Sequence, residues 1–186
     1  MPRENYNKQI FEILSKGHFI SSNSINSTQK KLYQYLEKEK EATQDYFDQI
    51  GFYLVEGKDC FYFSREEERS TLKSKLERAM RWISILDFFK SYDESFGVGT
   101  QITPSEVSSI IGVNQNLKNK LNLLKRITKK EKYDESVNEL FEILKKEGFV
   151  EVIDDLSMTY KVLNSFSYLE ELILSIDIEE PTTNEN

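Results

Sequence analysis

The amino-acid sequence predicts a mainly helical α+β fold with small β-hairpins, in which two winged-helix domains stand in tandem and are joined by a long helix. The first observation is a repeat: residues 45–63 and 139–162 each read as the end of a helix, a Gly-Phe pair and a two-stranded hairpin. The second is composition, because 3 Pro and 7 Gly with 31% charged residues are typical of a helix-rich chain. The third is a segment without Pro or Gly, residues 65–92, between the two repeats.

The first domain is expected to span residues 1–64 and to begin with three helices. The first helix ends at Gly17, which can take the left-handed conformation found at a helix C-terminus. Residues 18–20 follow as a short extended piece, and the third helix is predicted over residues 42–49. The side chains expected to face inward are Ile10, Phe11, Ile13 and Leu14 in the first helix, Leu32, Tyr35 and Leu36 in the second, and Tyr46, Phe47 and Ile50 in or just after the third.

A hairpin completes this domain in the order of a winged helix. Its strands carry apolar residues on either side of a polar turn at residues 56–59. Gly57 is expected to supply the positive φ that such a turn requires. Cys60 alternates with Phe61 and Phe63, which indicates a half-buried, structural cysteine.

The connector between the domains is expected to span residues 65–101 and to consist mostly of one long helix. Ser64 and Glu67 can form a capping box at its start, and an uninterrupted helix up to Tyr92 would be roughly 40 Å long at about 1.5 Å per residue. Residues 79–89 are apolar on most of the helix circumference, so both sides of the helix need to be covered. The apolar face of its first half is formed by Leu72, Leu76, Ala79 and Ile83.

The second domain is expected over residues 102–176, followed by an acidic, disordered tail at residues 177–186. Its first helix has the best local signal in the chain: Thr103 at the N-cap, a proline at the first helical position and a glutamate three residues after the cap. Two further helices lead to a second hairpin over residues 149–163. Ser167, with a glutamate three residues on, is expected to cap a last short helix.

The sequence contains no recognisable catalytic or cofactor-binding motif. A single cysteine excludes an internal disulfide, and the single histidine, His18, has no second histidine or cysteine beside it to complete a metal site. Gly97 and Gly99 lack the lysine and further glycine of a phosphate-binding loop. Adjacent carboxylates fall in a turn or in first helical turns, where they are favourable without a catalytic role. We therefore expect no cofactor and no metal ion, and enzymatic activity is a minor hypothesis.

Hydropathy and charge limit the cellular locations and the binding partners that we expect for the protein. The sequence has no 18-residue apolar run and no apolar core of a signal peptide at its start, so we expect a cytoplasmic protein without membrane contact. The net charge of -7 argues against a protein that binds nucleic acid over its whole surface. Any contact with DNA must therefore be local.

One basic segment, residues 117–132, is the candidate for such a contact. A winged helix usually reads DNA with its third helix, which needs outward basic and amide side chains, whereas both third helices here carry more acids than bases. The basic segment has one acid, Glu131, and seven bases: Lys118, Lys120, Lys125, Arg126, Lys129, Lys130 and Lys132. We expect sequence-independent, salt-sensitive contacts with phosphates. The alternative is a solvated helix face that contacts nothing.

Four stretches carry a resemblance to a known family. They are the opening FEILSKGHFI, the segment YFDQIGFYL followed by FYF, the aromatic helix WISILDFF and the closing FEILKKEGFVEV. In these stretches, across roughly Ile10–Ile173, the chain resembles the kite subunits of bacterial SMC-type condensin complexes, closest to the MksE and MukE group. The resemblance implies a non-enzymatic, homodimeric, nucleoid-associated subunit that binds the kleisin and, through it, an SMC-like ATPase, and that assists DNA holding in chromosome segregation or plasmid defence.

The resemblance also suggests a purpose for the apolar helix. Its large side chains could pack between the two domains or against a second protomer, or they could belong to the core of one domain. The residues concerned are Trp82, Ile85, Phe88 and Phe89.

Two other classes of protein remain open. A winged-helix regulator or replication-initiator module would bind a specific duplex on its own, and the acidic third helices argue against this. The second of these classes is a generic protein-interaction domain.

Overall fold

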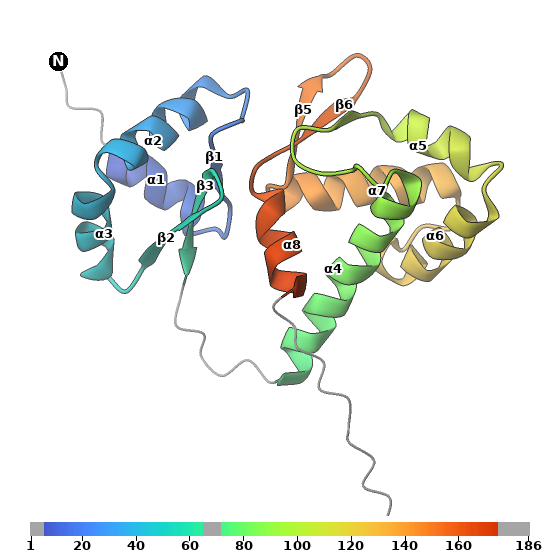
Figure 1. The fold of residues 1–186 in the computed structure, drawn as a ribbon, viewed down its shortest axis with the longest axis horizontal. Coiled ribbons are helices and arrows are strands. Elements are labelled where there is room, and N and C mark those ends of the chain that lie inside the picture. Colours follow the sequence, from blue (N-terminus) through green and yellow to red (C-terminus); the bar gives the residue numbers. More distant parts are fainter. Residues whose placement is uncertain (1–5, 65–71, 175–186) are drawn as a thin grey trace, which may run out of the picture.

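The computed structural model describes residues 6–64 and 72–174, with the backbone alone for residues 72–75, and confirms the predicted mixed α+β fold. The described residues form eight helices and two three-stranded antiparallel sheets. Figure 1 shows one sheet in each half of the molecule, with the last helix between the first half and the long helix.

The first half has the element order helix, strand, helix, helix, strand, strand. These elements are α1 (Tyr6–Leu14), β1 (Ile20–Ser21), α2 (Ser27–Lys38), α3 (Lys40–Asp48), β2 (Tyr53–Gly57) and β3 (Cys60–Ser64). The sheet order is β1-β3-β2, so the short β1 extends the hairpin at its β3 edge. Gly17 after α1 and Gly51 after α3 have φ values of 82° and 77°, as the sequence predicts for residues that end a helix.

The hairpin turn of the first half differs from its prediction. Gly57 lies in β2 opposite Cys60, and the positive φ of the turn belongs instead to Asp59, at 56°. A Cβ atom on Gly57 would lie 3.1 Å from the sulfur of Cys60, which is tighter than most Cβ contacts and would push the sulfur away by a few tenths of an ångström. The glycine is therefore favoured by the close approach of the two strands rather than by the turn conformation.

The second half repeats the same kinds of element with one helix added before the wing and one after it. Its elements are α4 (Leu72–Tyr92), β4 (Gln101–Ile102), α5 (Pro104–Ile111), α6 (Gln115–Thr128), α7 (Tyr133–Lys146), β5 (Val150–Asp154), β6 (Thr159–Val162) and α8 (Phe166–Leu174). The sheet order β4-β6-β5 matches that of the first half. The two halves thus share one topology, with a short first strand beside the second strand of the hairpin.

The two predicted caps of this half have different outcomes. Thr103 accepts a hydrogen bond from the Glu106 amide at 3.2 Å, and Glu106 Oε2 accepts one from the Thr103 amide at 2.7 Å, so the capping box is confirmed. The prediction for Ser167 is wrong, because α8 already begins at Phe166. The Ser167 hydroxyl lies in the first turn and donates to the carbonyl of Asn164 at 2.5 Å.

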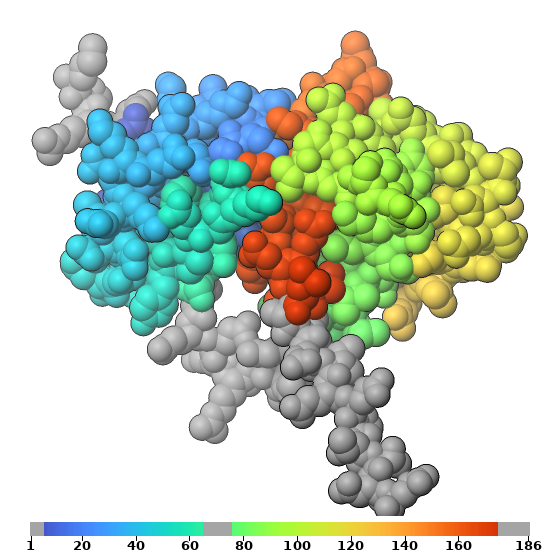
Figure 2. All heavy atoms as spheres, in the orientation of Figure 1, coloured from blue at the N-terminus to red at the C-terminus, as the bar shows by residue number. Residues whose placement is uncertain are grey.

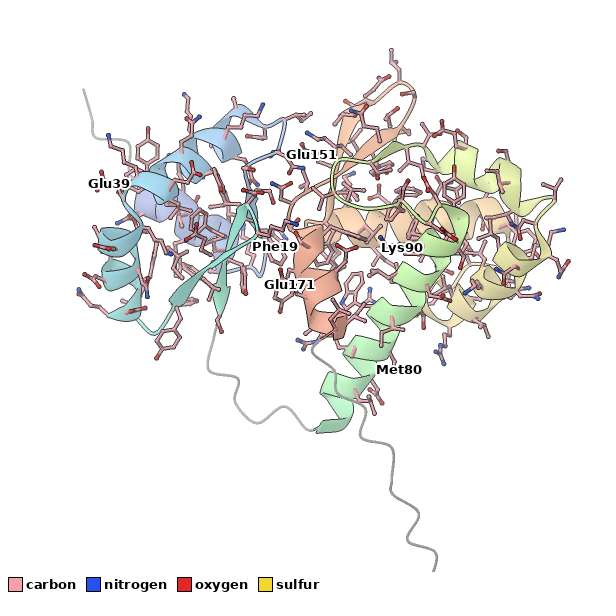
Figure 3. The ribbon with its side chains drawn as sticks, viewed as in Figure 1. Phe19, Glu39, Met80, Lys90, Glu151 and Glu171 are labelled. Carbon is pink, nitrogen blue, oxygen red and sulfur yellow. The ribbon has the colours of Figure 1, made fainter. Side chains whose placement is uncertain are left out.

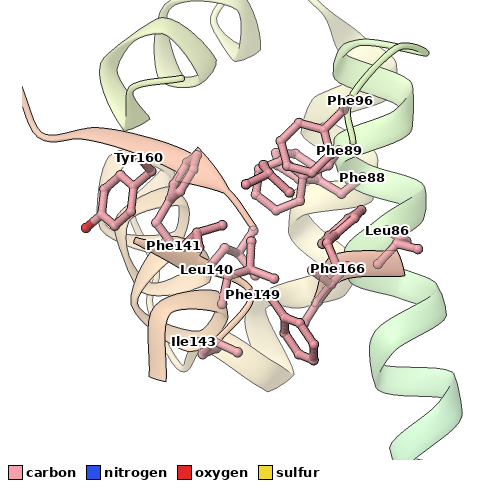
Figure 4. Close-up of a cluster of buried hydrophobic side chains, with 14 of the residues drawn as sticks. Leu86, Phe88, Phe89, Phe96, Leu140, Phe141, Ile143, Phe149, Tyr160 and Phe166 are labelled. Atoms are coloured by element: carbon pink, nitrogen blue, oxygen red, sulfur yellow. The ribbon is translucent and has the colours of Figure 1, made fainter. Parts of the chain in front are cut away.

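Helix α4 was predicted as part of a connector, but it packs into the core of the second half. It lies against α6 and α8, and Lys90 forms an ion pair with Glu170 of α8 at 3.2 Å. Figure 4 shows Phe88 and Phe89 of α4 facing the core side chains of α7 and the wing. The start of the predicted helix, with Glu67 of its capping box, and the acidic tail lie outside the described residues. The domain boundaries remain a prediction.

Three apolar side chains that were expected to face inward are exposed. Tyr46 is 51% exposed and Ile50 is 54% exposed, whereas Phe47 between them is fully buried. Helix α3 ends at Asp48, so the helical period cannot carry Ile50 to the buried face. Leu76 is also 53% exposed, and Figure 1 shows the start of α4 projecting past the end of α8.

Polar contacts join the loop after β1 to the second sheet. Asn23 Nδ2 donates to the carbonyl of Val162 at 3.3 Å, and Lys161 Nζ donates to the carbonyl of Asn23 at 2.6 Å. Asn164 donates its amide to Asn23 Oδ1 at 2.9 Å and its side chain to Ser22 Oγ at 2.8 Å. These bonds satisfy polar groups of both halves at once, so the halves form a joined structure rather than two separate modules.

Candidate functional site

The basic segment occupies α6 and the turn after it. Leu117, Leu121 and Leu124 are buried on one side of α6, which leaves its polar side chains outward. At about 100° per residue, Lys118 and Lys125 share one face. Lys129 ends the helix in the left-handed conformation, with φ of 55°, and its amide donates to the carbonyl of Lys125 at 2.7 Å.

The seven predicted bases do not form a uniform positive patch. Three of them form ion pairs: Lys125 with Glu131 at 3.1 Å, Lys130 with Glu139 at 3.9 Å and Lys132 with Glu135 at 3.1 Å. Lys120 points to the other side of α6, where it pairs with Asp87 of α4. The other three bases, Lys118, Arg126 and Lys129, form no ion pair within residues 6–64 and 72–174, and they are the cations most available to phosphate.

The acidic side chains of the two third helices face outward, as the sequence predicts. Glu41, Asp45 and Asp48 of α3 are exposed, and so is Glu142 of α7. A helix that presents these carboxylates would repel the phosphates on either side of a DNA groove. Among the described residues, α6 and the turn after it therefore stay the candidate segment for contact with nucleic acid.

The four apolar residues of α4 lie inside the chain. Trp82 is 4% exposed, and Ile85, Phe88 and Phe89 are fully buried. Phe89 stacks on Phe96 with a centroid distance of 4.6 Å. A second protomer could reach the last three only by displacing this packing.

A groove lies where the two halves meet. Its cavity volume is about 870 Å³, and it lies between the end of α1, strand β3, the exposed start of α4 and helix α8. Phe19 lies at the junction, with ring centroids 5.5 Å from Phe149 and 5.4 Å from Tyr168. Tyr62 and Tyr168 are 5.0 Å apart, and Trp82 meets Phe149 edge-on at 5.2 Å. Figure 3 shows Phe19 beside α8, with Glu171 on the same helix.

The groove is apolar enough to shift the titration of its neighbours. Burial raises the pKa of the Tyr62 phenol, with smaller contributions from Tyr168, Cys60 and Glu171. Burial also raises the pKa of the Cys60 thiol to about 12, helped by the carboxylates of Glu171 and Asp59. Cys60 is therefore a buried thiol with little thiolate character, as its strand position predicts.

Two kinds of feature are absent from the described residues. Residues 6–64 and 72–174 contain no cluster of three histidine, cysteine or carboxylate side chains that could hold a metal ion. Over the same ranges, no helix combines the length and apolar character needed to cross a membrane. His18 is exposed at the rim of the groove, and the structure gives it no metal-binding or nucleophilic partner among these residues.

The sequence did not reveal the groove. Phe19 reads as an apolar residue in a three-residue extended piece, and nothing in that pattern identifies Phe149 or Tyr168 as its neighbours. The one local signal is the run of aromatics in the first hairpin, where Tyr62 alternates outward from the buried Phe61. Sequence reasoning assigned it only to a strand.

Each half combines helices with a three-stranded antiparallel sheet that ends in a hairpin, which is the element order of the tandem winged-helix class, and one buried cluster joins Phe19 and Cys60 of the first half to the core of the second. The chain belongs to the MksE family: the model of the condensin complex protein MksE matches residues 5–173. This confirms the resemblance seen in the sequence and makes the chain an accessory subunit of a condensin-like complex. A comparison with curated proteins finds no match.

Proposed function

We propose that the chain is a non-enzymatic subunit that binds the kleisin of its complex and, through it, an SMC-like ATPase, and that it helps to hold DNA. The observation that carries this proposal is the family match over residues 5–173, which covers both halves of the chain. We propose further that the protein acts as a homodimer in the cytoplasm, at the nucleoid. Its dimer surface must lie outside Ile85, Phe88 and Phe89, because these side chains are already covered.

The proposed DNA contact is made by α6 and the turn after it. Lys118, Arg126 and Lys129 supply positive charge without a competing carboxylate among the described residues, and a contact of this kind senses phosphate rather than base sequence. A net charge of -7 keeps the isolated chain a weak binder. We therefore expect useful DNA contact in the assembled complex, where other subunits hold the duplex close to α6.

The test is purification of the full chain with the kleisin and the ATPase of its complex, followed by light scattering to read the stoichiometry. We expect a complex that contains two copies of this chain. A chain that stays monomeric and binds neither the kleisin nor the ATPase would contradict the proposal.

A second test addresses DNA. Charge reversal of four bases should abolish retention of DNA by the assembled complex and leave its stoichiometry unchanged. The bases are Lys125, Arg126, Lys129 and Lys130. DNA retention equal to that of the unchanged complex would overturn the DNA part of the proposal and leave the kleisin part standing.

The alternative function, a regulator that reads an operator by itself, predicts tight binding of one duplex by the isolated chain. The outward carboxylates of α3 and α7 oppose that mode. Titration of the isolated protein with specific and scrambled duplexes separates the two functions, since the proposed subunit should bind both equally and weakly.

A further inference from the structure

The outward side of α6 combines unpaired positive charge with an exposed apolar side chain. Helix α6 contains no acid, and Lys118, Arg126 and Lys129 form no ion pair with any residue of 6–64 or 72–174. Leu123, on the same helix, is 70% exposed. Leu123 and Arg126 are three residues apart and are therefore neighbours on the helix surface. A segment that covers this side of α6 needs carboxylates together with apolar side chains.

The residues that follow α8 have this composition. Residues 175–186, which lie outside the described part of the chain, carry four carboxylates and no cation. Removal of these four charges would more than halve the net charge of -7. Residues 176–180 read Ile-Asp-Ile-Glu-Glu, so two isoleucines stand among the acids. Both the charge and the apolar pattern of this acidic segment are complementary to α6.

Helix α8, which ends just before the acidic segment, lies close to α6. Both helices pack on α4, and Figure 1 shows α4 between them. Lys90 of α4 pairs with Glu170 of α8 at 3.2 Å, and Asp87, one turn earlier on α4, pairs with Lys120 of α6. Packed helix axes are about 8–10 Å apart, so two helices that pack on one neighbour are at most about 20 Å apart. Twelve extended residues span about 40 Å, which is enough for the segment to reach α6.

From these observations we infer that residues 175–186 lie over the outward side of α6 and compete there with DNA phosphates. The inference rests on the proposed function in one respect, because it takes α6 to be the helix that contacts DNA. The carboxylates of the acidic segment face Lys118, Arg126 and Lys129, and its isoleucines cover Leu123.

The contact is intramolecular, so weak ion pairs are enough to form it. A short tether raises the effective concentration of the acidic segment at α6 to about millimolar. Each exposed ion pair contributes little, which leaves the segment displaceable. The isolated chain thus shields its own phosphate-binding cations, and DNA that other subunits hold close to α6 displaces the segment.

A full-length variant with an uncharged segment tests the competition. Its four substitutions keep the size of each side chain: Asp177→Asn, Glu179→Gln, Glu180→Gln and Glu185→Gln. Binding of a fluorescent duplex, read by anisotropy at about 50 mM salt, should become about fivefold to tenfold tighter, because three cations are no longer shielded. The gain should shrink as salt rises. Absence of any gain would overturn the inference.

A matched variant separates local contact from the effect of total charge. It carries four substitutions in and just before α3: Glu39→Gln, Glu41→Gln, Asp45→Asn and Asp48→Asn. The net charge changes by the same amount at exposed positions of the first half, and Figure 3 shows Glu39 on the side that faces away from the second half. Charges so far from α6 are screened, so DNA affinity should change by less than about twofold. An equal gain in both variants would overturn the inference.

Cross-linking tests the contact without DNA. A carbodiimide joins a carboxylate to a lysine amine that lies against it, and mass spectrometry identifies the joined peptides. We expect links from residues 175–186 to Lys118 or Lys129, and we expect them to disappear at about 1 M salt, where the Debye length is about 3 Å. Links only to lysines outside α6 and the turn after it would overturn the inference. In a mixture of isotope-labelled and unlabelled chains, links mainly between the two kinds would mean that a second copy supplies the segment, which would also overturn it.

Charge reversal on α6 separates this inference from the proposed function. If Arg126→Glu with Lys129→Glu lowers DNA affinity and abolishes the gain from the uncharged segment, both stand. If it lowers DNA affinity while the uncharged segment gives no gain, the inference fails and the DNA part of the proposed function stands. If it leaves DNA affinity unchanged, that part of the proposed function fails. The competition then fails with it, even where cross-links show the contact.

Discussion

The hydroxyl of Ser24 donates a hydrogen bond to Oε2 of Glu151 at 2.8 Å, across 127 residues of sequence. The other carboxylate oxygen of Glu151 accepts the amide of Ile25 at 2.5 Å. A single carboxylate of β5 thus holds two consecutive residues of the loop after β1. Figure 3 shows Glu151 where this loop approaches the wing of the second half. The loop, which the sequence identifies only as polar, is a structural joint.

Replacing Glu151 should loosen this joint. We expect Glu151→Ala to cost about 1–3 kcal/mol of stability, because two donors lose a charged acceptor. Amide hydrogen exchange at Ile25 should accelerate, and exchange in α5 should not. Glu131→Ala, which breaks an exposed ion pair on another surface, is the control and should leave exchange at Ile25 unchanged.

The division of bases into paired and unpaired ones predicts unequal effects on DNA affinity. Arg126→Ala and Lys129→Ala should each lower the slope of log affinity against log salt by about 1 in the assembled complex, because each removes one phosphate contact. Lys120→Ala should have little effect, since Lys120 is engaged with Asp87. Equal effects at the three positions would mean that the ion pairs open when DNA binds.

Phe89 tests whether α4 is a core helix or an interface. Its ring is fully buried, 4.6 Å from Phe96 and 5.4 Å from Phe141. Phe89→Ala should lower the free energy of unfolding by about 3–5 kcal/mol through lost burial and a cavity. Denaturant unfolding at several protein concentrations checks the assignment: a loss within the chain is independent of concentration. Leu123→Ala, at a side chain 70% exposed, should stay within about 0.5 kcal/mol of the unchanged protein.

Tyr160 should make stability fall at high pH. Burial, together with the hydrogen bond that its hydroxyl donates to Glu142 at 2.9 Å, raises the pKa of this phenol from 10.0 to about 12. Because the folded pKa is above the unfolded one, this contribution to stability is present below pH 10 and is lost as pH rises toward 12.

Tyr160→Phe removes that pH dependence together with the hydrogen bond. We expect the variant to be about 0.5–1.5 kcal/mol less stable at pH 7 and to lose less stability between pH 10 and 12, as read by urea unfolding. Tyr33, whose pKa is also raised to about 12, still contributes to the fall, so the curve should flatten only in part. An unchanged pH profile would mean that the pKa of Tyr160 is the same in the folded and the unfolded protein.

The thiol of Cys60 should resist alkylation. The thiolate is the reactive form, and burial holds the pKa of this thiol at about 12, so iodoacetamide at pH 8 should react only when the chain opens. Mass spectrometry should show slow modification in buffer and rapid modification in urea. The control is Cys60→Ala with Asn122→Cys, which moves the only thiol to an exposed position and should react quickly in both.

The features that the sequence predicts well are those set by neighbouring residues. The capping box of Thr103 and the helix ends at Gly17 and Gly51 depend on a few adjacent residues, and the structure contains all three. Gly57 shows the limit of the same reasoning, since its close approach to the Cys60 sulfur outweighs the usual turn preference of glycine. The turn preference of glycine predicted a positive φ at Gly57, whereas pairing with Cys60 places this residue in a strand.

The features that the sequence could not provide depend on distant contacts. A count of charges identifies the basic segment. It cannot show that Lys120 donates to Asp87, 33 residues away, and therefore does not face the same side as the other bases. Hydropathy finds Phe19, but not that Phe149 and Tyr168 surround it. The periodicity of a helix also shows that residues 79–89 are apolar on most of the circumference of α4, without showing what covers each side.

The shared joint limits how this chain can be divided or recombined. Figure 2 shows the two halves in continuous contact on one face, with α8 between the first half and α4. Asn164 donates hydrogen bonds to both Asn23 and Ser22. If either half were exchanged for that of a relative, hydrogen-bond donors and acceptors on the remaining half would lose their partners. Functional chimeras therefore need residues 22–25 and the wing from the same parent. In natural relatives we expect these positions to change together.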